Sequence, residues 1–200
     1  MEYLNHEAVL SILPDRKPDS HKGDYGKILL LCGSRGYTGA AALAAMGALR
    51  SGAGLVYLAL PESIYAIEAC KLTEAIVLPL PDEGGTIAMS ALPEIRRLLP
   101  KMDAVLIGCG LGQSEGTRAV LETVLREFSG PGVVDADGIN LLAKHMDILR
   151  ERHAPTILTP HAGEFARLCG DPAGDRITVT ETFARLEFNN RAYRIQLFGL

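Results

Sequence analysis

The chain has 200 residues, of which 48% are hydrophobic and 22% are charged, and its formal net charge at pH 7 is −4. These values are typical of one globular domain with a real core, and they argue against a disordered chain. The negative charge gives no electrostatic basis for binding nucleic acid, and no apolar run approaches the roughly 18–20 residues of a membrane-spanning helix. Residues 1–10 lack the basic start and apolar centre of a signal peptide, so we expect a cytoplasmic protein.

Strand and helix signals alternate along most of the chain. Residues 5–13 are amphipathic, whereas residues 14–26 hold too many helix breakers to form a helix. Apolar runs then predict strands at 27–32, 55–60, 75–80, 104–107, 132–135 and 156–158. The segments between and after them predict helices at 40–51, 63–71, 91–99, 114–128, 139–150 and 163–169, with a turn at 81–85 and Ser114 as a helix cap. This alternation predicts a mostly parallel sheet with helices on both faces, a three-layer α/β/α fold.

The cysteines give no sign of a metal or redox motif. Cys32, Cys70, Cys109 and Cys169 are far apart, and no Cys-x-x-Cys pair exists. This spacing argues against zinc ribbons and thioredoxin-type chemistry. We interpret the four thiols as small hydrophobic side chains in a reducing compartment.

Four short loops each follow a predicted strand directly, at residues 33–40, 108–112, 135–140 and 159–164. In a parallel sheet the carboxyl ends of all strands lie at one edge, where ligands bind. Glycines, a histidine, and acidic and amide side chains therefore recur at that edge. The pattern favours a binding cleft over a purely structural module.

The first two loops are rich in glycine. The loop at 33–40 lacks the Gly-Lys-Ser/Thr ending of a Walker A motif and the Gly-x-Gly-x-x-Gly spacing of a dinucleotide fingerprint. It leads into a helix of small residues, whose first amides can face an anion. A plain tight turn is the alternative. At 108–112 the glycines allow either close approach of a ligand or close packing of the backbone.

Polar side chains mark the other two loops. One of Asp135 and Asp137 is a candidate to bind a hydroxyl group or a metal-bound water, and the other to cap the helix starting near Ile139. His161 follows a strand end, where it can point into the cleft, although a lone histidine is more often a surface or satisfied core residue. Glu164 opens the next helix, where a negative charge is favourable in any case.

Five motifs in order make the sequence resemble a known family. They are Lys-Gly-Asp-Tyr-Gly-Lys at 22–27, Gly-Ser-Arg with Tyr-Thr-Gly-Ala-Ala at 33–41, Ile-Gly-Cys-Gly-Leu-Gly at 107–112, Asp-Ala-Asp with Asn at 135–140, and Leu-Thr-Pro-His-Ala-Gly-Glu at 158–164. Over about residues 5–175 the chain resembles the ADP/ATP-dependent NAD(P)H-hydrate dehydratase family. The resemblance implies a ribokinase-like, Rossmann-like α/β fold. It also implies a hydro-lyase that uses ATP or ADP with Mg²⁺ to restore NAD(P)H from the S epimer of its hydrate, NADHX or NADPHX.

The resemblance also assigns site residues. It implies that Ala40, Gly110 and His161 contact the hydrated nucleotide, and that Asn140 and Glu164 line the same cleft. In this chemistry ATP phosphorylates the hydroxyl of the nicotinamide ring, and loss of phosphate restores the double bond. Full-length family members are expected to be homo-oligomers.

The sequence departs from the family pattern in several places. Cys109 and Ala162 stand where relatives often have proline. A Val-Leu-Lys-Gly segment and a Gly-Gly-Ser-Gly-Asp stretch, which carries the catalytic aspartate of the family, do not occur. We therefore expect a ribokinase-like dehydratase domain, incomplete at its C-terminal side, over residues 1–180, and an aberrant or disordered tail over 181–200. We assign no catalytic residue and no metal ligand, and expect little dehydratase turnover from these residues alone.

Two alternative functions share this fold. One is a small-molecule kinase of the ribokinase type, and the other is a nucleotide-binding domain without catalysis. The motifs at 22–27 and 159–164 together favour the dehydratase over the kinase.

Overall fold

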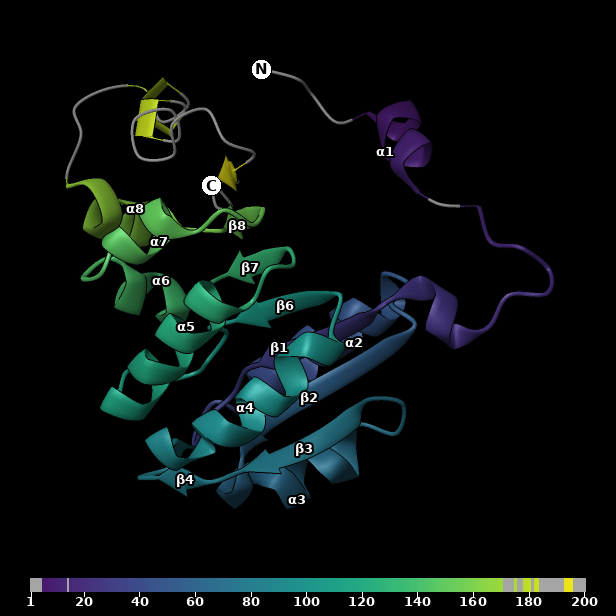
Figure 1. Cartoon of the computed structure of the whole chain (residues 1–200), viewed down its shortest axis with the longest axis horizontal. Coiled ribbons are helices and arrows are strands. Elements are labelled where there is room, and N and C mark those ends of the chain that lie inside the picture. The colour runs from purple at the N-terminus through teal and green to yellow at the C-terminus, as the bar shows by residue number, and fades with distance from the viewer. Residues whose placement is uncertain are drawn as a thin grey trace.

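A parallel sheet passes through the part of the chain that the structure describes. The computed structural model describes residues 5–13, 15–170, 175, 178–180, 182–183 and 193–195. Within them, seven parallel strands pair in the order β3-β2-β1-β6-β7-β8-β9 (Figure 1). They are β1 (Lys27–Leu31), β2 (Leu55–Pro61), β3 (Ile76–Leu80), β6 (Ala104–Ile107), β7 (Gly132–Val134), β8 (Thr156–Leu158) and β9 (Tyr193–Ile195). All six strands predicted from the sequence are present, with ends that differ by at most one residue.

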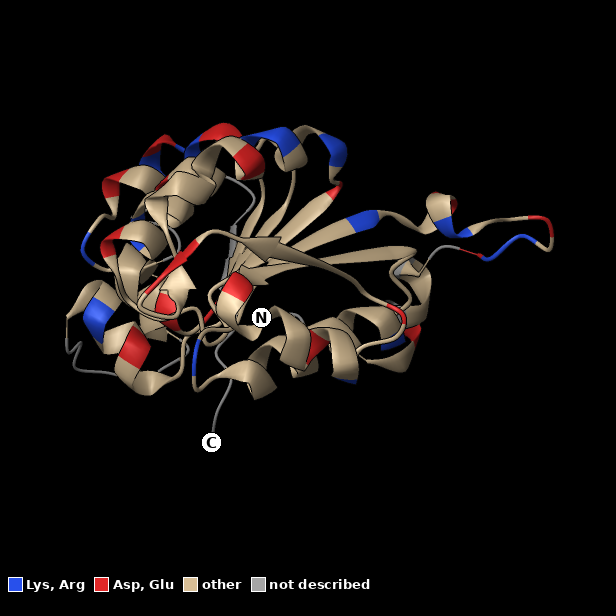
Figure 2. Ribbon diagram, turned by 90° about the horizontal axis from the view of Figure 1, so that it is seen from below, with Lys and Arg blue, Asp and Glu red and all other residues tan. Residues whose placement is uncertain are grey.

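Helices lie on both faces of this sheet (Figure 2). The α-helices are α1 (His6–Ile12), α2 (Thr38–Arg50), α3 (Glu62–Lys71), α4 (Leu92–Leu98), α5 (Glu115–Glu127), α6 (Asp137–Leu142), α7 (Asp147–Glu151) and α8 (Ala162–Cys169). Short 3-10 turns are η1 (Lys22–Tyr25), η2 (Met89–Ala91) and η3 (Leu99–Lys101).

The hydrophobic core is divided by the sheet into two clusters. Because successive side chains of a strand point to opposite faces, Leu29 and Leu31 of β1 belong to one cluster and Leu30 to the other. The first cluster includes residues of α4 and α5, and the second includes residues of α2 and α3. The predicted three-layer α/β/α architecture is therefore confirmed.

The turn predicted at 81–85 is part of a small hairpin. Strands β4 (Asp82–Glu83) and β5 (Thr86–Ile87) are antiparallel and form a sheet of their own. Gly84 and Gly85 join them with φ values of +62° and +85°. Glycine adopts this left-handed region at no steric cost, which explains the tight reversal. Strands of two residues are too short for a periodic pattern, so the sequence indicates only the turn.

The prediction of a single helix at 139–150 is wrong. The structure has two helices, α6 and α7, because the N–H groups of Lys144 and His145 bond three residues back instead of four and so end α6. Helix α7 is joined to α5 by Arg126, which forms ion pairs with Asp147 and Glu151 of α7.

The polar segment at 14–26 contains one helical turn that was not predicted, η1. His21 caps it, since His21 Nδ1 accepts from Gly23 N–H at 3.1 Å and the Asp24 carboxylate accepts from His21 N–H at 2.9 Å. The predicted amphipathic segment at 5–13 contains α1, which lies apart from the sheet (Figure 1).

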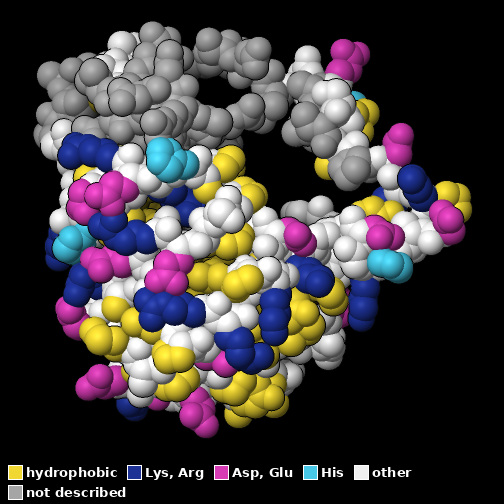
Figure 3. Space-filling view, in the orientation of Figure 1, with side chains coloured by type: hydrophobic (Ala, Val, Ile, Leu, Met, Phe, Trp, Pro, Cys, Tyr) yellow, Lys and Arg dark blue, Asp and Glu magenta, His cyan; other side chains and the backbone are white. Residues whose placement is uncertain are grey.

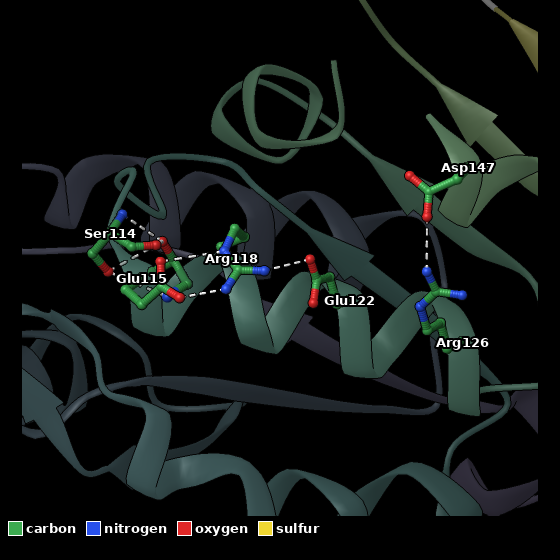
Figure 4. A network of polar contacts seen from close by, with 7 residues as sticks. Ser114, Glu115, Arg118, Glu122, Arg126 and Asp147 are labelled. Atoms are coloured by element: carbon green, nitrogen blue, oxygen red, sulfur yellow. Dashed lines mark hydrogen bonds and ion pairs between the residues drawn. The ribbon is translucent and has the colours of Figure 1, made fainter. Parts of the chain in front are cut away.

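Helix α5 has the cap that the sequence predicts. Ser114 Oγ accepts from Thr117 N–H at 3.2 Å, and Thr117 Oγ1 accepts from Ser114 N–H at 2.8 Å (Figure 4). Farther along the same helix, Arg118 forms ion pairs with Glu115 and Glu122. Acidic and basic side chains are interspersed over this face of the molecule (Figure 3), so opposite charges neutralise one another locally.

The tail predicted at 181–200 lies mostly outside the described residues. Within it the structure describes residues 182–183 and strand β9, whose Tyr193 is paired with Thr156 of β8. Phe183 packs edge-on against Phe165 of α8, with ring centroids 5.5 Å apart. Among the residues that the structure describes, every helix is too short or too polar to span a lipid bilayer.

Candidate functional site

The four predicted loops lie at one edge of the sheet. Each directly follows a strand, and those strands (β1, β6, β7 and β8) are parallel and adjacent in the sheet. The carboxyl ends of adjacent parallel strands meet at the same edge. The sequence prediction that Gly110 and His161 share one edge is therefore confirmed.

The loops after β1 and β6 are in direct contact. Gly33 N–H donates to the carbonyl of Cys109 at 2.9 Å, and Ser34 Oγ donates to the carbonyl of Gly110 at 2.7 Å. Gly110 has φ +62°, and a Cβ placed on it would lie 2.8 Å from Cβ of Ala40. Two of the predicted substrate-binding residues thus touch, and Gly110 must be glycine because a side chain there would collide with α2.

The start of α2 offers an electropositive surface beside this contact. In the described structure no side chain caps the helix at Tyr37, and its first turn carries no acidic residue. Lys71 of α3 reaches the same turn, where its Nζ donates to Thr38 Oγ1 at 3.0 Å and to Glu68 Oε1 at 2.7 Å. Helix amides favour an anion, and the Lys71 ammonium beside them is paired with the buried Glu68 carboxylate. Sequence reasoning missed Lys71 because 33 residues separate it from Thr38.

The two aspartates after β7 bind neighbouring loops. Asp135 accepts from Thr159 Oγ1 at 2.6 Å and from the Cys109 thiol at 3.2 Å. Asp137 accepts from Gly112 N–H at 2.9 Å and from Gln113 Nε2 at 3.1 Å.

The prediction that one of these aspartates caps α6 is wrong. The cap position is Ala136, with φ +48° and no side-chain hydrogen bond to the helix. This turn directs both carboxylates away from the helix and across to the adjacent loops. A non-glycine residue in the left-handed region stores strain, and such strain is commonly found at functional sites.

His161 caps α8. Its Nδ1 accepts from Gly163 N–H at 3.0 Å, its Nε2 lies 3.1 Å from Glu164 Oε1, and Glu164 Oε2 accepts from His161 N–H at 2.9 Å. An acceptor at Nδ1 fixes the neutral ring as the tautomer with a proton on Nε2. The His161 side chain is 59% exposed, whereas that of Glu164 is 8% exposed. His161 therefore faces solvent in a fixed orientation, and Glu164 serves to hold it.

Asn140 lies in α6 and faces α8. Its Oδ1 accepts from Arg167 at 2.8 Å. The predicted site residues thus form two groups along one edge: Ala40 with Gly110, and His161 with Glu164. Asn140 links α6 to the helix that His161 caps.

The Cys32 thiol near the site is not a nucleophile at neutral pH. A hydrogen bond with Cys109 and complete burial raise the pKa of the Cys32 thiol well above its usual value. The proton therefore stays on Cys32, consistent with our interpretation of a small buried side chain.

A cavity of about 940 Å³ lies at the other edge of the sheet. It is lined by Arg16, Tyr25, Gly52 and their neighbours, which precede β1 and β2. It includes none of the predicted site residues. In the described part of the chain, no three histidine, cysteine, aspartate or glutamate side chains cluster as metal ligands.

Comparisons with known proteins identify the family of this chain. A family model described as NAD(P)H-hydrate dehydratase matches residues 28–189. Bifunctional NAD(P)H-hydrate repair enzymes from Gloeobacter violaceus and Salinibacter ruber are 44% and 42% identical over 191 and 182 residues. These matches cover 90% and 88% of this chain but only 36% and 34% of the relatives, so the chain spans about a third of their length.

Solved structures share the fold. The ADP/ATP-dependent NAD(P)H-hydrate dehydratase from Bacillus subtilis, co-crystallised with ATP and Mg²⁺, is 32% identical with a TM-score of 0.77; the match covers 98% of this chain and 65% of that one. A ribokinase-like superfamily protein from Enterococcus faecalis is 22% identical with a TM-score of 0.79, and its match covers 98% of this chain and 66% of that one. With a family model matched over most of its residues, the chain belongs to the NAD(P)H-hydrate dehydratase family.

Proposed function

We propose that this chain supplies the substrate-binding side of an ATP- or ADP-dependent dehydratase that restores NADH or NADPH from the S epimer of its hydrate. The observation that carries the proposal is the contact of Ala40 with Gly110 at the open start of α2, on the same sheet edge as His161. The family membership supplies the reaction class.

The size of this edge suits a dinucleotide. From β1 through β6 and β7 to β8 there are three strand spacings, which is roughly 14 Å. A pyrophosphate near the start of α2 would meet helix amides and the Lys71 ammonium. The hydrated nicotinamide ring would then lie toward Gly110 or toward His161. The exposed imidazole of His161 is held in place by Gly163 and Glu164.

The adenine nucleotide and Mg²⁺ are part of the proposed reaction: the nucleotide would supply the phosphoryl group that makes the ring hydroxyl a good leaving group, and Mg²⁺ would offset the negative charge of the phosphates. The described residues do not form a site for them. Both Asp135 and Asp137 already accept hydrogen bonds from protein donors. We therefore assign to this chain the binding and orientation of the hydrate, and no phosphoryl-transfer step. A cytoplasmic location and self-association of the full-length protein belong to the same proposal.

Calorimetric titration of the 200-residue chain with the S epimer of NADPH hydrate tests the proposal. We expect saturable binding that is stronger than the binding of NADPH itself. A parallel assay with ATP and Mg²⁺, followed by the absorbance of the reduced nicotinamide, measures any dehydration. A folded chain that binds the hydrate no better than NADPH would contradict the proposal.

A further inference from the structure

The hairpin at residues 81–88 lies at the carboxyl edge and is fixed to its surroundings at several points. It follows β3, and Ala88 N–H donates to the carbonyl of Pro81 at 2.9 Å to close its base. Asp82 accepts from Ser63 N–H at the start of α3 at 3.2 Å. Ile87 is fully buried in the core cluster that also includes residues of α5. The hairpin is therefore anchored to both helical layers.

The tip of the hairpin rests on the loop that leads into α2. Arg35 N–H donates to the carbonyl of Gly85 at 2.8 Å. A Cβ placed on Gly85 would lie 2.4 Å from Cβ of Arg35, so the two backbones are in close contact. By contrast, a Cβ on the adjacent Gly84 would meet nothing within 4 Å.

The second strand of the hairpin rests on the loop after β6. The hydroxyl groups of Thr86 and Ser114 are hydrogen-bonded at 2.9 Å. A Cβ placed on Gly112 would lie 2.8 Å from the methyl group of Thr86. One small element thus contacts both glycine-rich loops, the same two loops that meet each other at Ala40 and Gly110.

We propose that the hairpin at 81–88 is a positioning element that fixes the spacing of the two glycine-rich loops, with Gly85 and Thr86 as its positioning residues. Its consequence for substrate rests on the proposed function. Glycine-rich loops have few side chains to restrain them and a large conformational freedom to lose. The hairpin restrains both loops before the hydrate binds. A shift of about 1 Å in such a contact can weaken a productive interaction by up to about 100-fold.

Matched glycine substitutions separate this role from simple backbone strain. Gly84→Ala and Gly85→Ala both place a side chain at a positive φ, but only Gly85→Ala pushes against Arg35. Thr86→Val removes the hydroxyl that bonds Ser114, and Thr86→Ser retains it. The measurements are amide hydrogen exchange of peptides covering residues 33–40 and 108–114 without ligand, the thermal unfolding midpoint, and calorimetric titration with NADPH hydrate.

We expect Gly85→Ala and Thr86→Val to speed exchange in both loops and to weaken hydrate binding roughly tenfold. Gly84→Ala and Thr86→Ser should resemble the wild type in both readouts, whereas the contact with Arg35 should lower the unfolding midpoint of Gly85→Ala by several degrees relative to Gly84→Ala. Equal loop exchange in Gly84→Ala and Gly85→Ala would overturn the inference. If no form binds the hydrate, the proposed function fails, and the exchange comparison still decides whether the hairpin holds the loops.

Discussion

Single residues at the sheet edge have structural roles beside the binding roles that we propose for them. The sequence placed Ala40, Gly110 and His161 at strand ends, because each follows an apolar run and a parallel sheet leaves no other edge for them. It did not indicate that His161 caps α8, since histidine is an uncommon cap. Nor did it indicate the hydrogen bond of Asp137 to Gly112, which joins residues 25 positions apart.

The capping role of His161 and its proposed binding role are separable by substitution. His161→Asn keeps a cap acceptor for the Gly163 amide, whereas His161→Ala loses it. We expect His161→Ala to lower the free energy of unfolding by about 1 kcal/mol and His161→Asn to leave it nearly unchanged. Both variants should bind NADPH hydrate more weakly in calorimetric titrations. Wild-type affinity in a folded His161→Asn protein would remove His161 from the proposed site.

Gly110 is expected to be sterically irreplaceable. Gly110→Ala adds a methyl group 2.8 Å from Cβ of Ala40 and 2.9 Å from Cβ of Tyr37, at φ +62°. Gly36→Ala is the control, because its φ is +90° but its Cβ would meet nothing within 4 Å. Urea unfolding should show a loss of roughly 1–3 kcal/mol for Gly110→Ala beyond that of the control. Equal losses would mean that the α2 contact adjusts freely.

Among the elements, the six strands marked by apolar runs were predictable, including the three-residue strands β7 and β8, whereas the break between α6 and α7, the 3-10 turns and the two-residue strands of the hairpin were not. The predicted helix at 139–150 followed the spacing of Leu141, Leu142, Met146 and Leu149, which continues through the turn between α6 and α7. The position of α7 as a separate helix depends on tertiary contacts, namely the ion pairs of Arg126 with Asp147 and Glu151. The hairpin was missed for a related reason, since its anchors in α3 and α5 are distant in sequence.

Arg152 joins several elements through one buried side chain. Its guanidinium donates to the carbonyls of Leu125, Phe128 and Gly130 and to Thr156 Oγ1 at 2.6–2.8 Å, and the residue is 4% exposed. Removing it leaves buried carbonyl groups at the end of α5 unpaired. We expect Arg152→Met to lower the free energy of unfolding by about 3 kcal/mol or more.

Arg152→Lys should recover little of that loss, because an ammonium group cannot reproduce the planar fork of donors. Arg97→Met is a surface control: Arg97 pairs with Glu94 at 61% side-chain exposure, so its loss should cost no more than about 1 kcal/mol. Urea unfolding of the three variants makes the comparison. A small loss for Arg152→Met, similar to that of the control, would show that water replaces the guanidinium.

At the scale of the whole molecule, the sheet order determines where stability is concentrated. The interior strand β1 lies between β2 and β6, and Leu29, Leu30 and Leu31 are fully buried on its two faces. From β6 through β7 to β8 the strands become shorter than β1, and Ile157 of β8 is 37% exposed. The alternation of strand and helix signals predicted this architecture, because each apolar run is long enough to be buried on both faces. It could not predict the strand order, which depends on contacts between distant segments.

Native-state amide hydrogen exchange should follow this order. Amides of residues 29–31 and 58–60 open only when both core clusters separate, so their exchange should be the slowest and should report global unfolding. Peptides from α1 and β8 should exchange at least about tenfold faster, because fewer buried side chains oppose their local opening. Mass spectrometry of peptic fragments measures these rates in one experiment. Exchange of β8 as slow as that of β1 would mean that the whole sheet opens as one unit, and the loop that carries His161 would then share the stability of the loops that carry Ala40 and Gly110.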